Sequence, residues 1–254
     1  MCVFSVAYRV FPDCPIFVLT NRDEATARPT LSPRRFEPLV SHGAPWFGGA
    51  DQRAGGTWLG VNERGQLVAV TNRKIDSVPA NPRSRGLLCR DVLEQAPEQH
   101  ATREFIREYA GFNLIDLSAD AANVVQYPGR QVQIRELKPG VHTIGNGDLD
   151  DQHDRRVQRT QVLVEEMVRA ERAGGWTDCI DRAKAICRLH AEGDEPAICL
   201  HGESWGTVGS TIVALARDPR QSQYHYALGP PCRTDYVDYS PALRQLLAPS
   251  ATDP

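Results

Sequence analysis

The chain has 254 residues, of which 41% are hydrophobic and 24% charged, a composition typical of a soluble globular protein. Its formal net charge is −3, so it lacks the basic excess that nucleic-acid-binding domains usually carry. No apolar run approaches the roughly 18 to 20 residues of a membrane-spanning helix. The composition therefore gives no support to a nucleic-acid-binding protein or to an integral membrane segment.

The first half of the chain is predicted to be rich in strands. Val3 to Arg9 and Ile16 to Thr20 are β-branched and aromatic runs joined by a Pro-containing turn. Residues 22 to 56 are rich in Arg, Pro and Gly without a clean period, so we expect a long loop there, which is more often functional than decorative. Residues 57 to 61 and 66 to 71 flank a polar turn and predict a β-hairpin.

Helices and further strands follow in separate blocks. Helices are expected over Ser84 to Glu94, Ala101 to Tyr109, Gln152 to Ala173 and Thr177 to His190. Strands are expected over Phe112 to Leu117, Asn123 to Tyr127, Gln131 to Leu137, Val141 to Gly145, Thr207 to Ala216 and Gln221 to Leu228.

The order of these blocks indicates the fold class. Strands and helices that segregate in this way favour an α+β layered fold with largely antiparallel sheets over a βαβ wind. No internal repeat or convincing linker is found, so we expect one domain over residues 1 to 254. The tail after about residue 230 is Pro-rich and polar and is expected to be mostly irregular.

Seven cysteines are scattered along the chain. An odd count without an export signal favours reduced thiols over a disulfide framework, because disulfides persist in oxidising compartments. Arg9 and Asp13 interrupt the apolar stretches near the N-terminus, and no basic leader precedes them, so no secretion signal is predicted. No C-x-x-C pair occurs, which gives little support to a structural zinc site. We therefore expect a cytoplasmic protein with free thiols.

Cys2 is the first candidate for chemistry. A cysteine near a terminus is usually a small buried hydrophobe. A nucleophilic thiol needs a base, because its unperturbed pKa of ~8.5 leaves only a few per cent thiolate at pH 7. Removal of Met1 would put an α-amino group with a pKa of ~7.7 to 8.0 on the same residue, which is a far better base at pH 7 than lysine. Cys2 is therefore either an N-terminal nucleophile or a bystander.

The stretch Asn21-Arg22-Asp23-Glu24 is the second candidate. Its ordinary interpretation is a strand that runs into a solvated charged turn. In the functional interpretation, Arg22 and a carboxylate line a pocket. An arginine beside a cysteine lowers the pKa of the thiol by favouring the thiolate, and a carboxylate can orient the terminal amine.

Several blocks of the sequence resemble one known family. The blocks are Met1-Cys2, Asn21 to Glu24, Arg28-Pro29, Gly55 to Asn62, Gly65, Thr71-Asn72 and, more weakly, Ser84-Arg85-Gly86, Gly111 to Leu114 and Gly145-Asn146. They resemble the NRDE family, also called the transport and Golgi organisation protein 2 family. Through it the chain more distantly resembles N-terminal-nucleophile hydrolases of the choloylglycine hydrolase and penicillin V acylase type. That resemblance implies a four-layer αββα fold.

The resemblance also implies roles for individual residues. Cys2 falls on the nucleophile, and Arg22 falls on the arginine near its sulfur. Asp23 falls on the amine-binding aspartate, but the spacing after the arginine differs, so Glu24 is a rival for that role. We also expect Asn21, Glu24 and Trp58 to contact the substrate.

Two asparagines are candidates for the oxyanion hole by the same resemblance. Asn72 falls on an oxyanion-hole asparagine and Asn146 on a second one. A side-chain N–H₂ can donate to the oxyanion of a tetrahedral intermediate, at up to about 3 to 4 kcal/mol per donor. The alternative for Asn146 is a turn asparagine at the end of a strand. Relatives often carry a basic residue where Val208 stands, which leaves a downstream arginine at the site in doubt.

The implied activity is hydrolysis of a non-peptide, linear amide bond of a small molecule, without a metal or an organic cofactor. The family also implies an alternative of another class, a protein that binds and delivers haem or an acyl-CoA lipid, since a terminal thiol can ligate haem iron. A third alternative is a hydrolase fold that has no activity.

Two further motifs have weaker claims. Gly202-Glu203-Ser204-Trp205-Gly206 fits the G-x-S-x-G pattern of serine hydrolases, with His225 as a base, but that pattern needs a helix directly after the serine. The residues that follow are strand-like. The acidic cluster from Asp148 to Asp154 could ligate a metal, but acidic residues are favoured at a helix N-terminus in any case.

Overall fold

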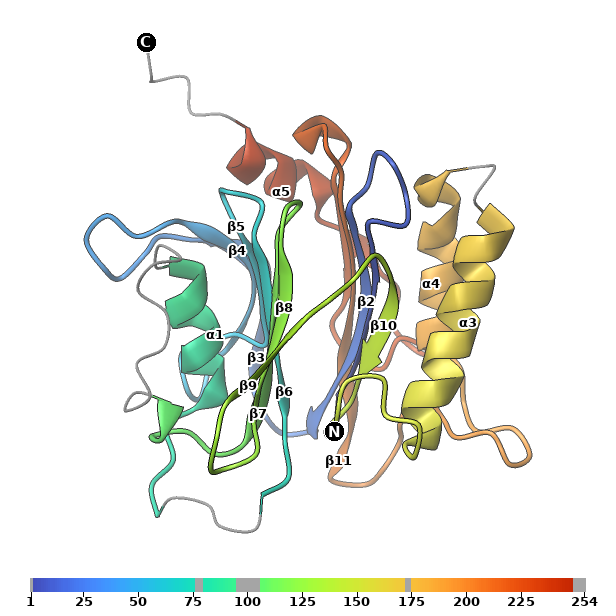
Figure 1. Cartoon of the computed structure of the whole chain (residues 1–254), viewed down its shortest axis with the longest axis horizontal. Helices are drawn as coiled ribbons and strands as arrows, with labels where there is room; N and C mark the ends of the chain where they lie inside the picture. Colours follow the sequence, from blue (N-terminus) through green and yellow to red (C-terminus); the bar gives the residue numbers. More distant parts are fainter. Residues whose placement is uncertain (1, 76–79, 95–105, 172–174, 249–254) are drawn as a thin grey trace.

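The computed structural model describes residues 2–75, 80–94, 106–171 and 175–248. Two antiparallel sheets stack face to face, and helices cover the outer face of each sheet (Figure 1). One outer layer holds α1 (Arg85–Glu94), and the other holds α3 (Arg155–Glu171) and α4 (Cys179–Cys187). The predicted four-layer αββα arrangement is confirmed.

The six-stranded sheet contains the first and the last strand of the described residues. In spatial order its strands are β10 (Gly140–Ile144), β1 (Val3–Tyr8), β2 (Ile16–Ala25), β11 (Trp205–Leu215), β12 (Gln223–Ala227) and β13 (Val237–Asp238). β1 and β2 form the predicted N-terminal hairpin, and β11 pairs with β2 along its whole length. The first strand of the chain therefore lies inside the sheet, with β10 on its other side.

The seven-stranded sheet is a meander in which chain order and spatial order agree. Its strands are β3 (Thr30–Phe36), β4 (Trp46–Asp51), β5 (Leu59–Asn62), β6 (Leu67–Asn72), β7 (Phe112–Leu117), β8 (Ala122–Tyr127) and β9 (Gln133–Glu136). Each strand pairs with the next in antiparallel register. The segment between β6 and β7 is longer than the other connections and contains α1.

Both faces of β1 are buried, which explains its continuous apolar sequence. Phe4 and Val6 belong to the apolar cluster between the two sheets, where Phe47 and Ile115 of the other sheet meet them. Ala7 points the other way, into the cluster beneath α3 and α4. A third cluster lies beneath α1. The alternation along each strand thus serves two cores at once.

The expectation of a long loop over residues 22 to 56 is wrong. β2 continues to Ala25, and β3 and β4 follow within this segment. β3 is an edge strand, so its basic residues can face solvent, and a register shift between Leu31 and Arg34 accommodates Pro33. In β4, a Cβ on Gly49 would lie 2.5 Å from the Trp58 ring. Strand pairing and close packing therefore determine the conformation of residues 22 to 56. Neither of them produces a hydrophobic period in the local sequence.

The expectation of a mostly irregular tail after residue 230 is also wrong. The tail contributes β13 and α5 (Ser240–Leu247), whose Leu243 and Leu246 are buried in the cluster between the sheets. The helix begins with Ser240-Pro241, where proline suits the first turn. Two buried leucines in so short a helix were too weak a pattern to recognise.

The other elements lie within a few residues of their predicted bounds, with short 3₁₀ turns at Trp176–Asp178 and Pro219–Gln221. The expected helix from Ala101 to Tyr109 falls largely outside the described residues. Among the helices of the described segments, none has the length and apolarity to cross a bilayer.

A histidine on β10 gives the fold a pH-dependent contact. His142 Nδ1 lies 2.8 Å from Asp150 Oδ2, and this hydrogen bond raises the pKa of His142 although burial opposes it. A histidine whose pKa is raised by folding adds stability below its unfolded pKa of ~6.5, and this stability disappears as pH rises through the folded pKa.

We therefore expect the stability difference between wild type and His142→Gln to be largest near pH 6, under about 1 kcal/mol, and to vanish at alkaline pH. Urea unfolding at several pH values measures it. His153→Gln, at an exposed position, is the control and should show a smaller pH-dependent difference. A difference that grows with pH would contradict the assignment.

Candidate active site

The register of the N-terminal hairpin brings Cys2 next to Arg22. Val3 lies opposite Asn21 in the antiparallel pair of β1 and β2, so the preceding residue faces the following one. On the other side, a Cβ built on Gly145 would lie 3.8 Å from the carbonyl oxygen of Cys2. Cys2 is therefore held where β1 begins and next to the part of β2 that contains Arg22.

A cavity of about 240 Å³ opens at this end of the two sheets. Six of the predicted site residues line it, and they come from both sheets and the connections between their strands: Cys2, Arg22, Asp23, Glu24, Trp58 and Asn72. The structure therefore brings together residues that are up to 70 positions apart in the chain.

Arg22 is fixed on three sides. Its Nη1 donates to Thr30 Oγ1 at 2.7 Å, and its Nη2 lies 3.3 Å from Asp51 Oδ2. The guanidinium carbon lies 4.3 Å from the centre of the Trp58 ring, a cation–π contact that explains the position of Trp58 in the lining. With 5% of its surface exposed, Arg22 is a buried, preoriented positive charge beside the sulfur.

Asp51 holds this arrangement together and was not predicted. Its Oδ2 also accepts from Arg28 Nε at 2.5 Å, while Oδ1 accepts from the backbone N–H groups of Arg53 and Ala54. One buried carboxylate thereby orients two arginines at the cavity. It lies at the end of β4, inside the segment that was expected to be a loop, so no strand pattern pointed to it.

The two carboxylates of the NRDE motif have different partners. Asp23 is buried, and its carboxylate accepts from Thr207 Oγ1 and from Arg156 Nη1, each at 2.6 Å. Burial raises the pKa of Asp23, and Arg156 opposes this rise. Glu24 instead accepts from its neighbouring N–H and lies 3.5 Å from Arg28. Asp23 is thus the carboxylate that is buried against the cysteine.

Burial raises the pKa of the Cys2 thiol. The negative charge of Asp23 raises it further, whereas the Asp23 backbone N–H and the Arg22 charge lower it. The balance favours the neutral thiol. Reaction at neutral pH therefore needs a base within reach of the sulfur.

Asn72 and Asn146 meet, but they occupy different positions. Asn72 lies at the end of β6 and lines the cavity. Asn146 donates from Nδ2 to the backbone carbonyl of Asn72 and is not part of the lining. Beside it, Thr71 Oγ1 donates to the Gly145 carbonyl at 2.7 Å. The loop after β10 is therefore tied to β6, and the Asn146 side chain contacts the backbone of Asn72.

The structure corrects the expectation for Asn21. Its side chain is fully buried on the helix side of the sheet, where Nδ2 donates to the carbonyls of Cys187 and Ile198 at 2.9 and 3.0 Å. Alternation along β2 puts Asn21 on the opposite face from Arg22. Asn21 therefore connects the sheet to α4 and the following loop and makes no contact with the cavity.

Arg85 lines the cavity and was not assigned a role from the sequence, although Ser84-Arg85-Gly86 was among the weaker matches. Its Nη1 donates to the Gly111 carbonyl at 3.1 Å. Burial lowers the pKa of Arg85, while Cys2 and Glu24 act in the opposite direction. In the described part of the chain, no carboxylate lies within ion-pair distance of Arg85. It is the cation best placed to receive an anionic ligand group.

Backbone packing explains how two sequence blocks meet at this cavity. The N–H of Thr57 donates to the Gly86 carbonyl at 3.0 Å, and a Cβ on Gly56 would lie 2.2 Å from the carbonyl carbon of Gly86. Only glycine permits such an approach. The contact places the start of α1, with Arg85, over the Trp58 side of the cavity.

The two weaker motifs have structural roles. Ser204 is exposed and followed by β11 instead of a helix, so the geometry of a serine-hydrolase elbow is absent there. In the acidic cluster, Asp154 Oδ1 accepts from the N–H groups of Arg156 and Val157 at the start of α3. This is the helix-capping role that the sequence favoured.

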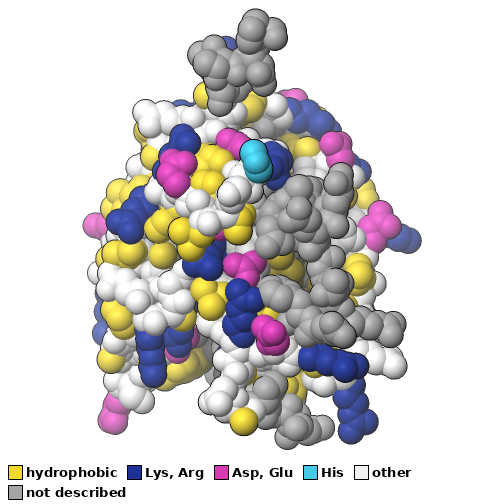
Figure 2. All heavy atoms as spheres, turned by 90° about the vertical axis from the view of Figure 1, so that its left-hand side faces the viewer, with side chains coloured by type: hydrophobic (Ala, Val, Ile, Leu, Met, Phe, Trp, Pro, Cys, Tyr) yellow, Lys and Arg dark blue, Asp and Glu magenta, His cyan; other side chains and the backbone are white. Residues whose placement is uncertain are grey.

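The surface of the face that carries α1 has no large patch of a single charge among its described residues (Figure 2). On the face that carries α1, basic and acidic side chains lie interspersed over the coloured surface (Figure 2). This pattern agrees with the small net charge of −3.

These features define a class of fold. Two stacked antiparallel sheets lie between helical layers, an arrangement that is shared with a solved hydrolase structure. The fold is similar to a solved structure of the C2A mutant of conjugated bile acid hydrolase from Clostridium perfringens, with a TM-score of 0.51 and 10% identity. The match covers 95% of this chain and 93% of that one.

The chain belongs to the Transport and Golgi organisation 2 family, whose model matches residues 1–224. It is 30% identical to the Transport and Golgi organization protein 2 homolog of Bos taurus, over 80% of this chain and 83% of the relative. The Homo sapiens homolog is 27% identical with the same coverage. The predicted family is confirmed.

Proposed function

We propose that this protein is an N-terminal cysteine hydrolase that cleaves a linear amide bond of a small molecule. The observation that carries the proposal is the convergence of Cys2, Arg22, Asp23 and Asn72 on one cavity. The fold shared with a conjugated bile acid hydrolase supports this reaction class. No single segment of the chain could assemble these groups.

The proposed reaction begins once Met1 has been removed. The free α-amine of Cys2 takes the proton of the thiol, and the thiolate attacks the amide carbon to form a carbon–sulfur bond. The oxyanion accepts a hydrogen bond from the side-chain N–H₂ of Asn72. Asp23 orients the resulting ammonium, which protonates the leaving amine as the carbon–nitrogen bond breaks. Water then hydrolyses the thioester and restores the thiol.

The lining of the cavity points to a small, charged substrate. Its 240 Å³ is below the ~300 to 1,000 Å³ of ordinary small-molecule sites. The cavity is bordered by Arg28, Arg83 and Arg85, of which Arg28 is neutralised by Asp51 and Glu24, and Arg83 pairs with Asp91 at 2.7 Å. Arg85 is then available for a carboxylate or similar anionic group on the substrate.

The alternative of a haem or acyl-CoA carrier is less well supported. A macrocycle or an acyl chain needs an extensive apolar pocket. Trp58 and Val70 are the largest apolar side chains in a lining that is dominated by charged groups. Titration of haem with the wild-type protein provides the check, since a saturable Soret shift that Cys2→Ala removes would favour the carrier.

The proposed function is tested first at the N-terminus. We expect intact-mass analysis of the protein from its native host to show loss of Met1. We also expect Cys2 to react with a library of thiol-reactive amides more than about tenfold faster than the other six cysteines, because burial without a partner base raises the pKa of a thiol. Cys14, whose pKa is raised to about 12, and Cys179, raised to about 11, are internal references.

Two results would refute the mechanism. Complete retention of Met1 would leave the thiol without its amine base. Labelling of Cys2 no faster than of Cys14 or Cys179 in processed protein would show that the site does not activate the sulfur.

A further inference from the structure

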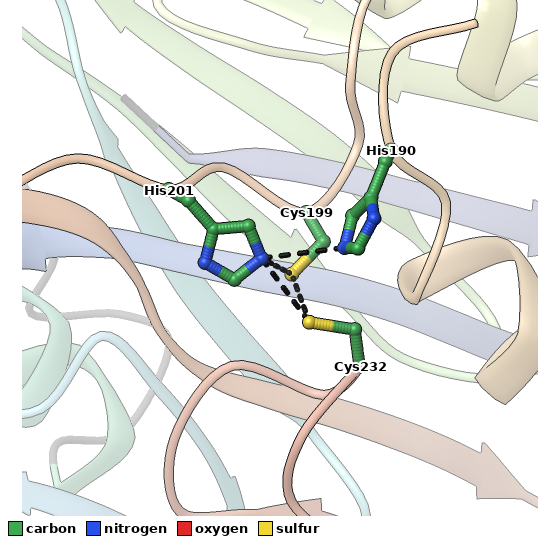
Figure 3. A group of neighbouring side chains, drawn as sticks. All are labelled: His190, Cys199, His201 and Cys232. Atoms are coloured by element: carbon green, nitrogen blue, oxygen red, sulfur yellow. Dashed lines mark hydrogen bonds between the residues drawn. The ribbon is translucent and has the colours of Figure 1, made fainter.

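Four side chains that can ligate a metal meet at the end of the sandwich near α4. They are His190, Cys199, His201 and Cys232, and their ligand atoms all lie within 4.8 Å of one another. Figure 3 shows the two imidazoles and the two thiols converging on one point from three separate loops. Cys2 and the cavity residues are not part of this cluster.

Three of the four distances between ligand atoms are close to those of a tetrahedral site, and the distance from His201 Nε2 to Cys232 Sγ is shorter. With Zn–S of about 2.3 Å and Zn–N of about 2.05 Å, tetrahedral geometry requires about 3.8 Å between sulfurs, 3.6 Å between sulfur and nitrogen and 3.3 Å between nitrogens. The two sulfurs lie 3.6 Å apart, and the two Nε2 atoms lie 3.3 Å apart. His201 Nε2 lies 3.7 Å from Cys199 Sγ and 3.1 Å from Cys232 Sγ.

The backbone holds these ligands in place independently of any ion. Cys199 donates its N–H to the Leu189 carbonyl at 2.8 Å, which fixes it beside His190. Arg188 Nε donates to the Pro231 carbonyl at 3.0 Å, next to Cys232. The loop with His201 is closed by the Leu200 N–H, which donates to Thr207 Oγ1. The ligands are therefore preorganised, and this lowers the cost of binding.

We propose that His190, Cys199, His201 and Cys232 bind a structural Zn²⁺ ion. Two thiolates and two neutral imidazoles are a ligand set that favours zinc, and four protein ligands leave no open position for catalysis. Binding releases the two thiol protons, so the bound site is neutral. Cys199 is buried while both histidines are exposed, which gives the ion a path from solvent.

The proposed site departs from the expectation that a structural zinc site had little support. That expectation rested on the absence of a C-x-x-C pair, whereas the ligands here come from the segment after α4, the loop before β11 and the loop after β12. Cys232 also lies outside the 1–224 segment that matches the family.

The ion would stabilise a loop that is hydrogen-bonded to residues behind the candidate active site. The carbonyl of Ile198, next to Cys199, accepts from Asn21 Nδ2 at 3.0 Å and from Arg156 Nη2 at 2.6 Å. Arg156 in turn holds Asp23. Two hydrogen bonds of Arg156 thus connect the loop that contains Cys199 to the carboxylate of Asp23.

The test uses the full-length chain without an affinity tag. We expect about one zinc ion per chain by elemental analysis. Cys199→Ser and Cys232→Ser should each weaken zinc binding by more than about 100-fold, since even outer-shell changes cost 10- to 100-fold. Cys2→Ser changes a thiol outside the cluster and should keep the full zinc content. Cobalt substitution should give intense visible bands of a tetrahedral ion together with a thiolate charge-transfer band that Cys232→Ser abolishes.

Stability provides an independent measurement. Chelation should lower the Tm of wild type and of Cys2→Ser and leave that of Cys232→Ser unchanged. The proposal is overturned if wild type binds neither zinc nor cobalt with a thiolate band. It is also overturned if mass analysis of protein purified without oxidant shows a Cys199–Cys232 disulfide. None of these readouts depends on amide hydrolysis.

Discussion

Replacing Cys2 by alanine is expected to reduce the rate of amide hydrolysis by more than about 10⁴-fold, as removal of a catalytic nucleophile does in other hydrolases. The thiol is the only group in the proposed mechanism that forms a covalent bond to the substrate. The measurement is kcat/KM on a panel of short N-acyl amino acids, which combine an amide with the carboxylate that Arg85 would receive. Because Cys2 precedes β1 and only its side chain changes, the Tm should stay close to that of wild type.

Two further variants separate chemistry from binding. Arg85→Met should raise KM by about tenfold and leave kcat within a few-fold, because it removes a contact that is made in both the ground state and the transition state. Cys2→Ser should retain measurable but much slower turnover, since the amine and Asn72 remain. Wild-type rates in Cys2→Ala would show that another group carries the reaction.

The candidate site was predictable where it depended on the hairpin register. Two β-rich runs joined by a short turn imply antiparallel pairing, and that pairing alone brings Cys2 beside Arg22. Asn72 could be placed because it ends a strand of a hairpin with a clear turn. The roles expected for these residues came from the resemblance to a known family. The periodicity of the sequence predicts strands and helices but not the role of a residue.

The rest of the site depends on which face a side chain takes and on contacts far along the chain. Asn21 and Arg22 are adjacent in the motif, yet one faces the helices and the other the cavity. Asp51 reaches the cavity because β4 pairs within the seven-stranded sheet, and Arg85 reaches it because Gly56 packs against Gly86. Neither contact produces a pattern in the local sequence. The zinc ligands come together only because β12 returns beside β11.

The extent of the domain stays a prediction. One apolar cluster receives side chains from β1, from the seven-stranded sheet and from α5 near the C-terminus. This shared core supports one folding unit over residues 1 to 254, and a single cooperative unfolding transition would agree with it.

Replacing Arg156 by methionine is expected to lower the free energy of unfolding by about 3 to 5 kcal/mol, because it removes the positive charge that contacts the buried carboxylate of Asp23. Asp23 is 3% exposed, and Arg156 contacts its carboxylate at 2.6 Å. Arg155→Met removes an arginine from the exposed side of the same helix and should change stability by less than about 0.5 kcal/mol. Urea unfolding at pH 7.5 compares the two variants.

The pH dependence identifies the cause of this loss. Burial already raises the pKa of Asp23, and removal of Arg156 takes away the opposing charge. A carboxyl group whose folded pKa is raised destabilises the fold when ionised, and that penalty disappears as pH falls through the folded pKa. The deficit of Arg156→Met should therefore shrink from pH 7.5 to pH 5, and adding Asp23→Asn should recover part of it at pH 7.5. A deficit that is constant with pH and unaffected by Asp23→Asn would mean that Arg156 acts through packing and its bond to Ile198 alone.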